Sequence, residues 1–391
     1  MNFILADGNY REHLLPFTFT RPVADIRIGI LTIREKWERV LNCEVSALTE
    51  SYLSVKYPLV LAKVNVVIHA SFLPNQDFVD AVRKLRLGEA LISNEEVIAY
   101  ATGDPQKGFD LAAYKSIVLN STLITVKNTW DIFSKNGEAL QADYDLITAG
   151  RKSAPIADTN RVIAPENIFL EEGAQVEHSI LNASTGPIYL GKDTLVMEGN
   201  MIRGAFALCE KAVVKMGAKI YGPTTIGPYG KVCGEINNSV IFGYSSKGHD
   251  GYLGNAVLGE WCNIGADSNN SNLKNNYAKV RLWNYATERF DQTDLQFCGL
   301  MMGDHSKTAI NTMFNTGTVI GVSVNVYTPG FPRNYVPSFS WGGASGFSAY
   351  LPKKAFEAAK VMMARRGVEF DEKEADILYH VFELTKKWRK Y

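Results

Sequence analysis

The sequence has no excess of charge of either sign and contains little cysteine. Lysine plus arginine and aspartate plus glutamate both number 41 in 391 residues, so the net charge is zero. This balance provides no overall field for attracting nucleic acid or an anionic membrane. The five cysteines are widely spaced and form no CxxC pair. Their spacing argues against a disulfide framework or a zinc knuckle and favours free thiols in a reducing compartment.

Long hydrophobic runs are also missing. The longest apolar stretch, YPLVLAKVNVVIHASFL, is interrupted by Lys63, Asn65 and His69. It is therefore not typical of a membrane span. The opening MNFILADGNY lacks the basic segment and apolar run of a signal peptide. We expect a cytoplasmic protein that has neither a membrane nor a nucleic acid as partner.

The middle of the sequence contains a repeat of six residues. Seven consecutive aliphatic positions follow it: Leu190, Val196, Ile202, Leu208, Val214, Ile220 and Ile226. A period of six fits neither one long helix nor one long strand. It is typical of a parallel β-helix, in which three short strands per coil meet at tight corners and the aliphatic residues lie inside. The alternative is a β-sandwich with chance spacing, which seven consecutive matches disfavour.

The sequence before the repeat predicts an α/β domain, because strand and helix patterns alternate. NFILA and VNVVIHA are typical of strands, ADIRIGILTIREKWERVL and NQDFVDAVRKLRLG have helical spacing, and GEALISNEEVIAYATG is typical of a hairpin. After the repeat, LPKKAFEAAKVMMARRG and DEKEADILYHVFELTKKWRKY predict two helices. We divide the chain into a shortened α/β domain (1–105), a connecting region (106–160), a left-handed parallel β-helix (161–345) and a C-terminal helical tail (346–391).

One segment of the repeat region, HDGYLGNAVLGEWCNIGADSNNSN, has a narrower pattern. It resembles the acetyltransferase half of the bifunctional UDP-N-acetylglucosamine pyrophosphorylase/glucosamine-1-phosphate N-acetyltransferase family, in which a histidine precedes a tyrosine by three residues and LGxAxxGxxxNIGA follows. His249, Tyr252, LGNAVLG and NIGA have this spacing here. The resemblance implies that His249 is the general base that takes a proton from the amino group of the sugar, because imidazole titrates near neutral pH. The structural alternative is an exposed histidine in a turn.

The same resemblance implies a set of substrate contacts. Tyr252 and Asn263 match residues that bind the sugar phosphate or orient the base, and Asn272 matches an asparagine that faces the sugar. The tyrosine that follows in the family is Leu273 here, and the basic residue is displaced. An ammonium group suits a phosphate, although each lysine could equally be a solvated side chain. The candidate lysines are Lys231, Lys247, Lys274 and Lys279.

The segment GDHSKTAINTMFNTGTVIG (303–321) stands where the family has its acetyl-coenzyme A groove. The expected contacts to this co-substrate are Thr308, Thr312 and Thr318. His305 raises the alternative of a hexapeptide-type carbonic anhydrase, whose zinc needs about three converging histidines. The repeat region offers only His178, His249 and His305, with no close pair. The predicted site therefore contains no metal.

The N-terminal LADGNYREHLLPFTFTRPVADI resembles the opening of the sugar nucleotidyltransferases, a strand followed by a phosphate loop, LxPxT and a basic residue. The resemblance implies that Gly8 and Arg11 face nucleotide phosphates, that Arg21 replaces the usual lysine, and that Mg²⁺ bridges the phosphates if this half is active. The loop has one glycine where the family has three. The region before the repeat is also shorter than the family's nucleotide-binding domain.

Together these motifs predict a two-domain transferase. The favoured reaction is acetyl transfer from acetyl-coenzyme A to glucosamine-1-phosphate, with uridylyl transfer to give UDP-N-acetylglucosamine left open. The family builds its acetyl site between neighbouring prisms, which implies a homotrimer. One alternative is a sugar-1-phosphate nucleotidyltransferase, such as a glucose-1-phosphate thymidylyltransferase, whose β-helix serves only oligomerisation. Another is a sugar-nucleotide binder without catalysis.

Overall fold

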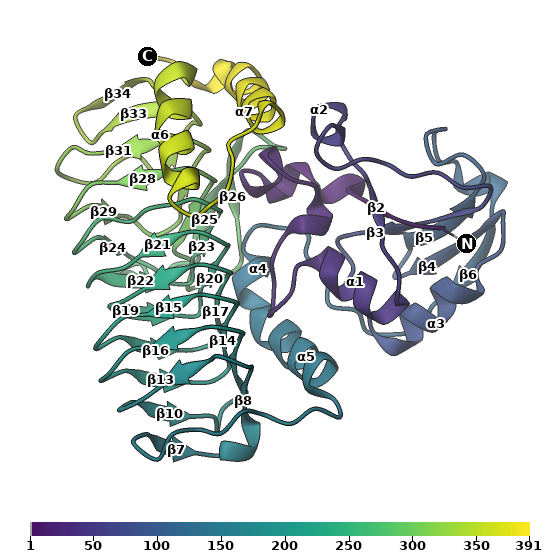
Figure 1. Cartoon of the computed structure of the whole chain (residues 1–391). Helices are drawn as coiled ribbons and strands as arrows, with labels where there is room; N and C mark the ends of the chain where they lie inside the picture. Colours follow the sequence, from purple (N-terminus) through teal and green to yellow (C-terminus); the bar gives the residue numbers. More distant parts are fainter. Residues whose placement is uncertain (1) are drawn as a thin grey trace.

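The computed structural model describes residues 2–391. It consists of an N-terminal α/β domain, a parallel β-helix and two C-terminal helices, as Figure 1 shows. These three parts confirm the fold class predicted from the alternation of strand and helix patterns and from the six-residue repeat.

The α/β domain contains a six-stranded mixed sheet in the order β2-β1-β3-β5-β4-β6. Its strands are β1 (Asn2–Ala6), β2 (Ser46–Leu48), β3 (Asn65–His69), β4 (Glu89–Ser93), β5 (Glu96–Thr102) and β6 (Lys115–Val118). β1 pairs in parallel with β2 and β3, and β4 and β5 form the predicted hairpin. β6 lies within the predicted connecting region (106–160), yet it pairs with β4 and belongs to this sheet.

The helices of the α/β domain are α1 (Ile33–Leu41), α2 (Ser51–Ser54) and α3 (Gln76–Lys84). α1 is shorter than the helical pattern suggested, because Thr32 and Glu35 form a capping box that starts the helix there. α3 ends at Lys84, and the expected terminator Gly88 instead lies in the turn before β4, with a φ of 81°. Trp37 of α1 and Phe78 of α3 pack edge to face in the core, with ring centroids 5.0 Å apart.

The β-helix has three faces, which we name A, B and C. Face A is a nine-stranded parallel sheet of β8 (Ile168–Leu170), β11 (Ile188–Leu190), β14 (Phe206–Leu208), β17 (Thr224–Ile226), β20 (Val240–Ile241), β23 (Val257–Leu258), β27 (Leu300–Met302), β30 (Thr318–Ile320) and β32 (Tyr335–Val336). Face B contains β7 (Arg161–Ile163), β10 (Ile180–Asn182), β13 (Met201–Arg203), β16 (Lys219–Tyr221), β19 (Glu235–Asn237) and β22 (Tyr252–Gly254).

Face C starts with a five-stranded sheet and continues through Asn263, which bridges Ser246 and Lys307. The five strands are β9 (Gln175–Val176), β12 (Leu195–Val196), β15 (Val213–Val214), β18 (Lys231–Val232) and β21 (Ser246–Lys247). The later strands of this face are β28 (Lys307–Thr308), β31 (Asn325–Val326), β33 (Ser340–Gly343) and β34 (Gly346–Ala349). β24 (Asn269–Asn270) pairs with β29 (Met313–Phe314), and β25 (Arg281–Asn284) forms a hairpin with β26 (Arg289–Gln292).

The aliphatic residues of the six-residue repeat lie in the interior of the coils. Leu190 pairs with Leu170 below it and with Leu208 above it, and all three side chains are buried. The inward-facing residues of face C stack on one another and begin with valines. Lys247 pairs in register with Val232 and continues this stack, and its side chain is also buried. The interior of the β-helix is therefore aliphatic except for a few positions, and Lys247 carries a formal charge there.

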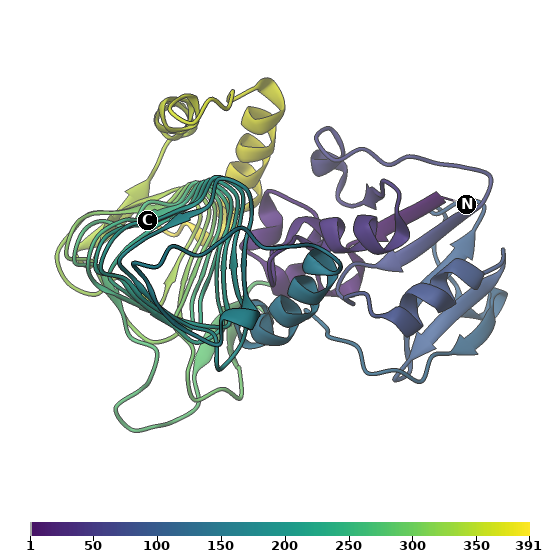
Figure 2. The ribbon, with the colours of Figure 1, turned by 60° about the horizontal axis from the view of Figure 1, so that its bottom comes forward.

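The N-terminal domain lies against face A, and α4 (Asp131–Ser134) and α5 (Asn136–Thr148) join the two parts. Figure 2, viewed nearly along the β-helix, shows a triangular prism with the N-terminal domain on one side. Asn136 donates its amide to Thr225 Oγ1 over 3.1 Å, and Thr225 donates to the carbonyl of Gly29 over 2.8 Å. One continuous apolar core includes Phe17 of the N-terminal domain and Phe242 of the β-helix, whose ring centroids are 5.5 Å apart.

The chain ends in α6 (Pro352–Ala364) and α7 (Glu372–Leu384). α6 runs along the upper part of the β-helix, and α7 lies between the β-helix and the N-terminal domain (Figure 1). Glu374 of α7 contacts both sides, because it pairs with Lys56 and lies 3.9 Å from His305. Among residues 2–391, no helix is long and apolar enough to cross a membrane.

Candidate functional site

His249 lies at the corner where β21 of face C ends and β22 of face B begins. Its side chain is exposed, whereas Lys247 two residues earlier is 1% exposed. The ammonium of Lys247 donates to the backbone carbonyls of His249 and, over 2.8 Å, of Asp250. The buried lysine therefore fixes the backbone of this corner from inside, and the imidazole of His249 lies on the outside.

Burial also changes the acidity of Lys247. Removal from water lowers the pKa of its ammonium to about 8, although nearby acidic groups, including Asp250, oppose the shift. Its position inside the prism makes Lys247 an anchor of the corner, and its ammonium does not lie on the surface where a sugar phosphate could reach it.

Tyr252 and Asn272 are brought together next to this corner. Asn272 donates its side-chain amide to Tyr252 Oη over 2.9 Å and to Asn255 Oδ1 over 2.7 Å. Asn269 accepts the backbone N–H of Tyr252 over 2.7 Å. Tyr252 and Asn272, both predicted substrate contacts, thus form one polar pair at the start of β22. Tyr252 follows His249 by three residues.

A shallow cavity of about 490 Å³ opens at the His249 corner. Lys215, Cys233, His249, Asp250 and Asp267 contribute to its lining. The imidazole of His249 has no hydrogen bond with any other group in the described part of the chain. Residues 2–391 therefore supply a scaffold and a cavity for His249 but no hydrogen-bonding group that orients its ring.

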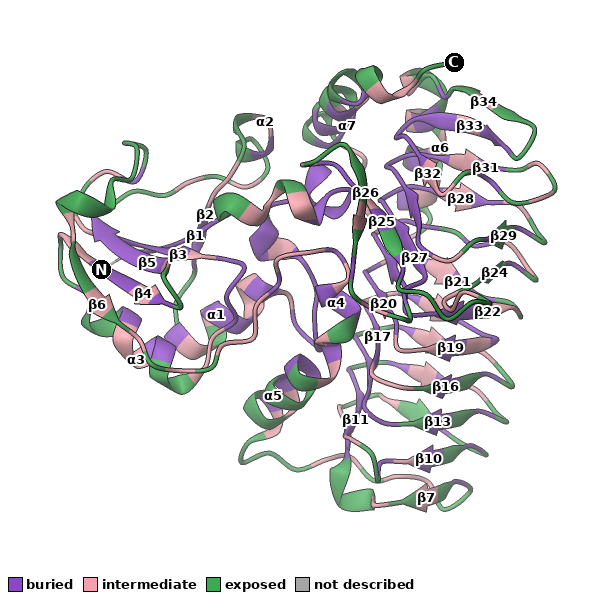
Figure 3. Cartoon of the chain, turned by 180° about the vertical axis from the view of Figure 1, so that it is seen from behind, coloured by how far each residue is buried: buried purple, intermediate pink, exposed green. Residues whose placement is uncertain are grey.

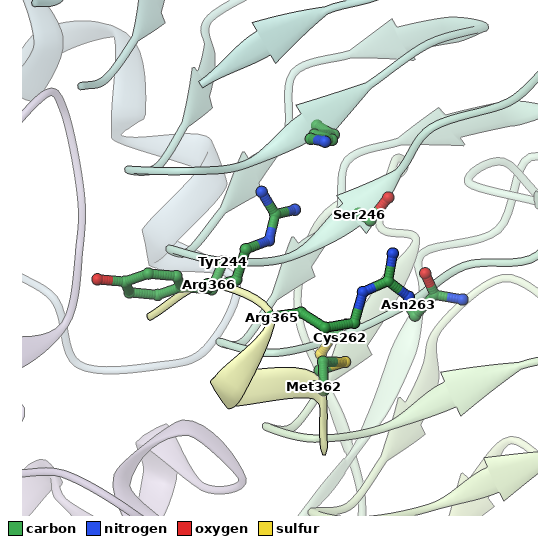
Figure 4. A pocket seen from close by; sticks show the side chains of 8 residues that line it. Tyr244, Ser246, Cys262, Asn263, Met362, Arg365 and Arg366 are labelled. Atoms are coloured by element: carbon green, nitrogen blue, oxygen red, sulfur yellow. The ribbon is translucent and has the colours of Figure 1, made fainter. Parts of the chain in front are cut away.

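Asn263 and Lys231 lie elsewhere, on the outer surface of face C. Both line a second cavity of about 330 Å³ between face C and the end of α6, which Figure 4 shows. The structure does not bring Asn263 next to Tyr252, because the two residues belong to different faces of the prism. Sequence analysis missed Arg365 and Arg366, which also line this cavity. Their only signal was the pair of arginines at the end of a predicted helix.

Lys274 and Lys279 both belong to the long excursion that carries the β25–β26 hairpin. Lys274 donates to the carbonyl of Lys279 over 3.1 Å, and Lys279 pairs with Asp294 over 2.8 Å. These two lysines thus bind partners within their own loop.

Thr308, Thr312 and Thr318 are buried in the coils. The hydroxyl of Thr308 accepts the N–H of Gly265 over 3.0 Å. Those of Thr312 and Thr318 donate to backbone carbonyls three residues earlier, over 2.9 and 2.7 Å. All three hydroxyls therefore bind backbone groups of the coils themselves.

The predicted nucleotide loop follows β1, and Gly8 adopts a φ of 62° there. Arg11 donates to the carbonyl of Thr18 and to Tyr52 Oη, each over 2.7 Å, and lies 3.3 Å from Asp7. Arg21 is buried against the β-helix, where it pairs with Asp304 and, over 3.3 Å, with Glu260. Both arginines are therefore bound to protein groups, and Arg21 joins the two domains.

Asp7 supplies a buried carboxylate directly before this loop. Asp7 accepts hydrogen bonds from the N–H of Val23 and from Thr49, and burial raises the pKa of its carboxyl group to about 6 despite these bonds. A Mg²⁺ ion that bridges nucleotide phosphates takes only one or two carboxylates from the protein, because phosphate and water oxygens complete its ligand shell. No group of three or more His, Cys, Asp or Glu side chains suited to a metal occurs within residues 2–391.

A polar cluster beside the loop was missed by sequence analysis. Tyr10 donates to Glu96 over 2.7 Å, and Glu96 also pairs with Lys127, whose ammonium lies 4.7 Å from the Tyr10 ring centroid. These residues come from three separate elements, so no local motif could have predicted their meeting.

Comparison with known proteins finds a family model that matches the N-terminal part of the chain. Residues 3–152 match the family model described as Sugar nucleotidyl transferase. The chain is also 30% identical over 87 residues to the Bifunctional protein GlmU of Methanocaldococcus jannaschii. This alignment covers 22% of the chain and 21% of the relative, so it spans about a fifth of that protein. The family match and this relative confirm the resemblance stated from the sequence, and they agree with the predicted class, a transferase.

Comparison with solved structures found two UDP-N-acetylglucosamine acyltransferases. The Arabidopsis UDP-N-acetylglucosamine acyltransferase is 15% identical, with a TM-score of 0.25, over 55% of this chain and 80% of its own. The UDP-N-acetylglucosamine acyltransferase from Campylobacter jejuni is 14% identical, with a TM-score of 0.28, over 60% and 83%. The fold assignment of the present chain rests on its own strand pairing.

Proposed function

We propose that the chain transfers the acetyl group of acetyl-coenzyme A to the amino group of glucosamine-1-phosphate at the corner that carries His249. The observation that carries the proposal is the anchored corner, in which buried Lys247 binds the carbonyls of His249 and Asp250 and leaves the imidazole exposed beside a cavity. A rigid backbone under a reactive side chain is what precise positioning of a base requires.

In this mechanism His249 acts as the general base. It takes a proton from the amino group as the nitrogen attacks the thioester carbonyl, the C–N bond forms and the C–S bond breaks. The imidazolium then returns the proton to the leaving thiolate, so free coenzyme A and the N-acetyl sugar result. A base in this role contributes about 10²–10⁴ in rate. The Tyr252–Asn272 pair provides a hydroxyl and an amide beside the corner for contacts to the sugar or its phosphate.

A trimer completes the proposed site. His249 has no orienting partner within the described residues of its chain, which supports a contribution from a neighbouring copy. Face B offers a surface for this contact, since Ile180 and Met201 are each 45% exposed there and Tyr221 is 36% exposed. In Figure 3, β10 and β13 of this face carry both exposed and buried residues, whereas strands of face A that meet the N-terminal domain are buried.

Nucleotidyl transfer by the N-terminal domain is the second candidate function. The family match over residues 3–152 supports it, and the Tyr10–Glu96–Lys127 cluster near Gly8 offers polar groups for a substrate. Arg11 and Arg21 already bind groups within the protein, so this activity ranks second. Its assay is pyrophosphate release from a nucleoside triphosphate and a sugar-1-phosphate.

The first test is the release of free coenzyme A from acetyl-coenzyme A and glucosamine-1-phosphate. His249→Ala is expected to lower the rate by about two orders of magnitude or more. His178→Ala is the matched control, because His178 is also an exposed corner histidine of the β-helix, with a φ of 49°. Equal loss in both variants, or no release from folded wild-type protein, would rule out the proposed reaction and leave pyrophosphate release as the assay to pursue.

A further inference from the structure

We propose that the groove between the end of α6 and face C binds a phosphate ester through Lys231, Arg365 and Arg366. The groove is the cavity of about 330 Å³ described above, and Tyr244, Ser246, Asn263 and Met362 complete its lining. It differs from the His249 corner in its residues and in the face of the prism on which it opens. The inference therefore does not depend on acetyl transfer.

The main argument is an uncompensated group of positive charges. Within residues 2–391, Lys231, Arg365, Arg366 and the nearby Lys215 have no carboxylate within 4.0 Å. Burial lowers the pKa of Lys231, and the charges of Arg366, Lys215 and Arg365 lower it further. Like charges gathered in this way repel one another, and a bound anion removes the repulsion. The groove therefore favours a ligand that carries negative charge.

The geometry of α6 directs the two arginines into the groove. Ala355, Ala359 and Met363 form its buried side, and the helix ends directly before Arg365. Figure 4 shows both arginines extending from the end of α6 over face C, where Arg365 reaches toward Asn263. Planar guanidinium groups bind phosphate through two parallel hydrogen bonds, which makes a pair of arginines a suitable cradle for this group.

The remaining lining suggests an ester in which an organic part accompanies the phosphate. The Ser246 hydroxyl and the Asn263 amide offer further hydrogen bonds, while Tyr244 and Met362 offer apolar surface. The ring of Tyr244 is stacked on Trp261, with centroids 4.1 Å apart, so it is firmly placed. A sugar phosphate and coenzyme A, with its 3′-phosphate and diphosphate, both present this chemistry.

Lys215 connects the groove with the His249 corner. It lines the corner cavity, and its charge also acts on Lys231 in the groove. Its ammonium would lie 3.8 Å from a Cβ placed on Gly248, directly before His249. A ligand whose phosphate is bound by the arginines could therefore extend along face C toward this corner.

The test is calorimetric titration of the full chain with coenzyme A, dephospho-coenzyme A, glucosamine-1-phosphate and inorganic phosphate. The variant is Arg365→Gln/Arg366→Gln. Lys353→Gln/Lys354→Gln is the matched control, because it removes the same charge from exposed positions in the first turn of the same helix. We expect the arginine variant to bind its phosphate ester about tenfold more weakly or worse, and the control to bind as wild type does. Added salt should weaken wild-type binding.

The pattern of losses identifies the source of the phosphate. A loss with coenzyme A, together with weak wild-type binding of dephospho-coenzyme A, assigns the 3′-phosphate. An equal loss with both coenzymes assigns the diphosphate. A loss confined to glucosamine-1-phosphate assigns a sugar phosphate. Lys231→Met provides a second variant and should repeat the same loss.

Two results would overturn the inference. One is wild-type binding of these ligands that stays unchanged in the arginine variant and in Lys231→Met. The other is the absence of binding of all four probes to folded wild-type protein. His249→Ala should keep the affinity of the groove, so failure of acetyl transfer and failure of this inference give different results.

Discussion

Arg21 of the N-terminal domain and Asp304 of the β-helix form an ion pair whose two side chains are 6% and 4% exposed. Thr20 donates to the same carboxylate over 2.7 Å, and Asp304 also accepts the backbone N–H of Glu260 over 2.9 Å. Glu260 is a second acidic partner of Arg21. The interface between the two parts of the molecule therefore contains a charged network in which Arg21 and Asp304 are buried and Glu260 lies at the partly exposed edge.

Loss of one partner in this network should strongly destabilise the protein. Arg21→Met leaves Asp304 buried without its cation, and such a change costs about 3–5 kcal/mol. Urea denaturation should show this loss in the free energy of unfolding. Lys279→Met is the control, because it removes the cation of an exposed pair with Asp294, and exposed pairs contribute little. A similar loss of stability in both variants would contradict a large contribution of the buried ion pair to the free energy of unfolding.

Lys247 should give the stability of the protein a distinct dependence on pH. Its pKa falls from 10.5 to about 8 on folding, because burial disfavours the charged form. Between these values the unfolded chain binds more protons than the folded chain, so stability should increase as pH rises from about 8 to about 10.5. Below about pH 8 the contribution is constant, because the lysine is charged in both states.

The measurement compares the free energy of unfolding of wild type and Lys247→Met at pH 7, 9 and 10.5. The stability of wild type relative to the variant should rise across this series, because other titrating groups are common to both. Lys219→Met, an exposed lysine on the neighbouring face B, should follow wild type. A constant difference between wild type and Lys247→Met would mean that the buried lysine does not titrate as described. The same variant should also release coenzyme A more slowly, since the His249 corner loses its anchor.

Charge placed on face B should separate the proposed trimer. Met201→Lys introduces an ammonium at a position that is exposed in the single chain and apolar in character. If three copies meet there, burial of an unpaired charge opposes association. Light scattering should then report a smaller particle, and coenzyme A release should fall with it. Val118→Lys in β6, where the residue is 66% exposed on the N-terminal domain, should change neither property. If the wild-type protein is a monomer, face B is not a contact between copies and the proposed trimer is wrong.

The sequence predicted the parts of the fold that follow from local pattern. The six-residue aliphatic repeat identified the β-helix because every coil must place an apolar side chain in the same interior. Leu190, Leu208 and Ile226 do stack on one another there. Lys247 was interpreted as a surface contact for phosphate. Strand pairing instead places it in register with Val232 on the inner column, and a lysine at an inner position gives no local sign of its orientation.

The site was less predictable because its residues meet through tertiary structure. Asn263 follows Tyr252 by eleven positions, which on a three-sided coil leads to another face. Arg365 and Arg366 join Lys231 only after α6 has folded back along the prism. Arg21 matched a family position by its neighbours in sequence, whereas its partners, Asp304 and Glu260, come from coils that no local pattern connects with it.

The position of the N-terminal domain on face A places the two proposed sites on different sides of the prism. The His249 corner joins faces B and C, the edge of the triangular prism that lies opposite face A, as the view along the prism illustrates (Figure 2). A product of one proposed site would therefore have to pass around the outside of the prism to reach the other proposed site of the same chain. Any intermediate shared by the two halves would diffuse through bulk solvent, where other enzymes could compete for it.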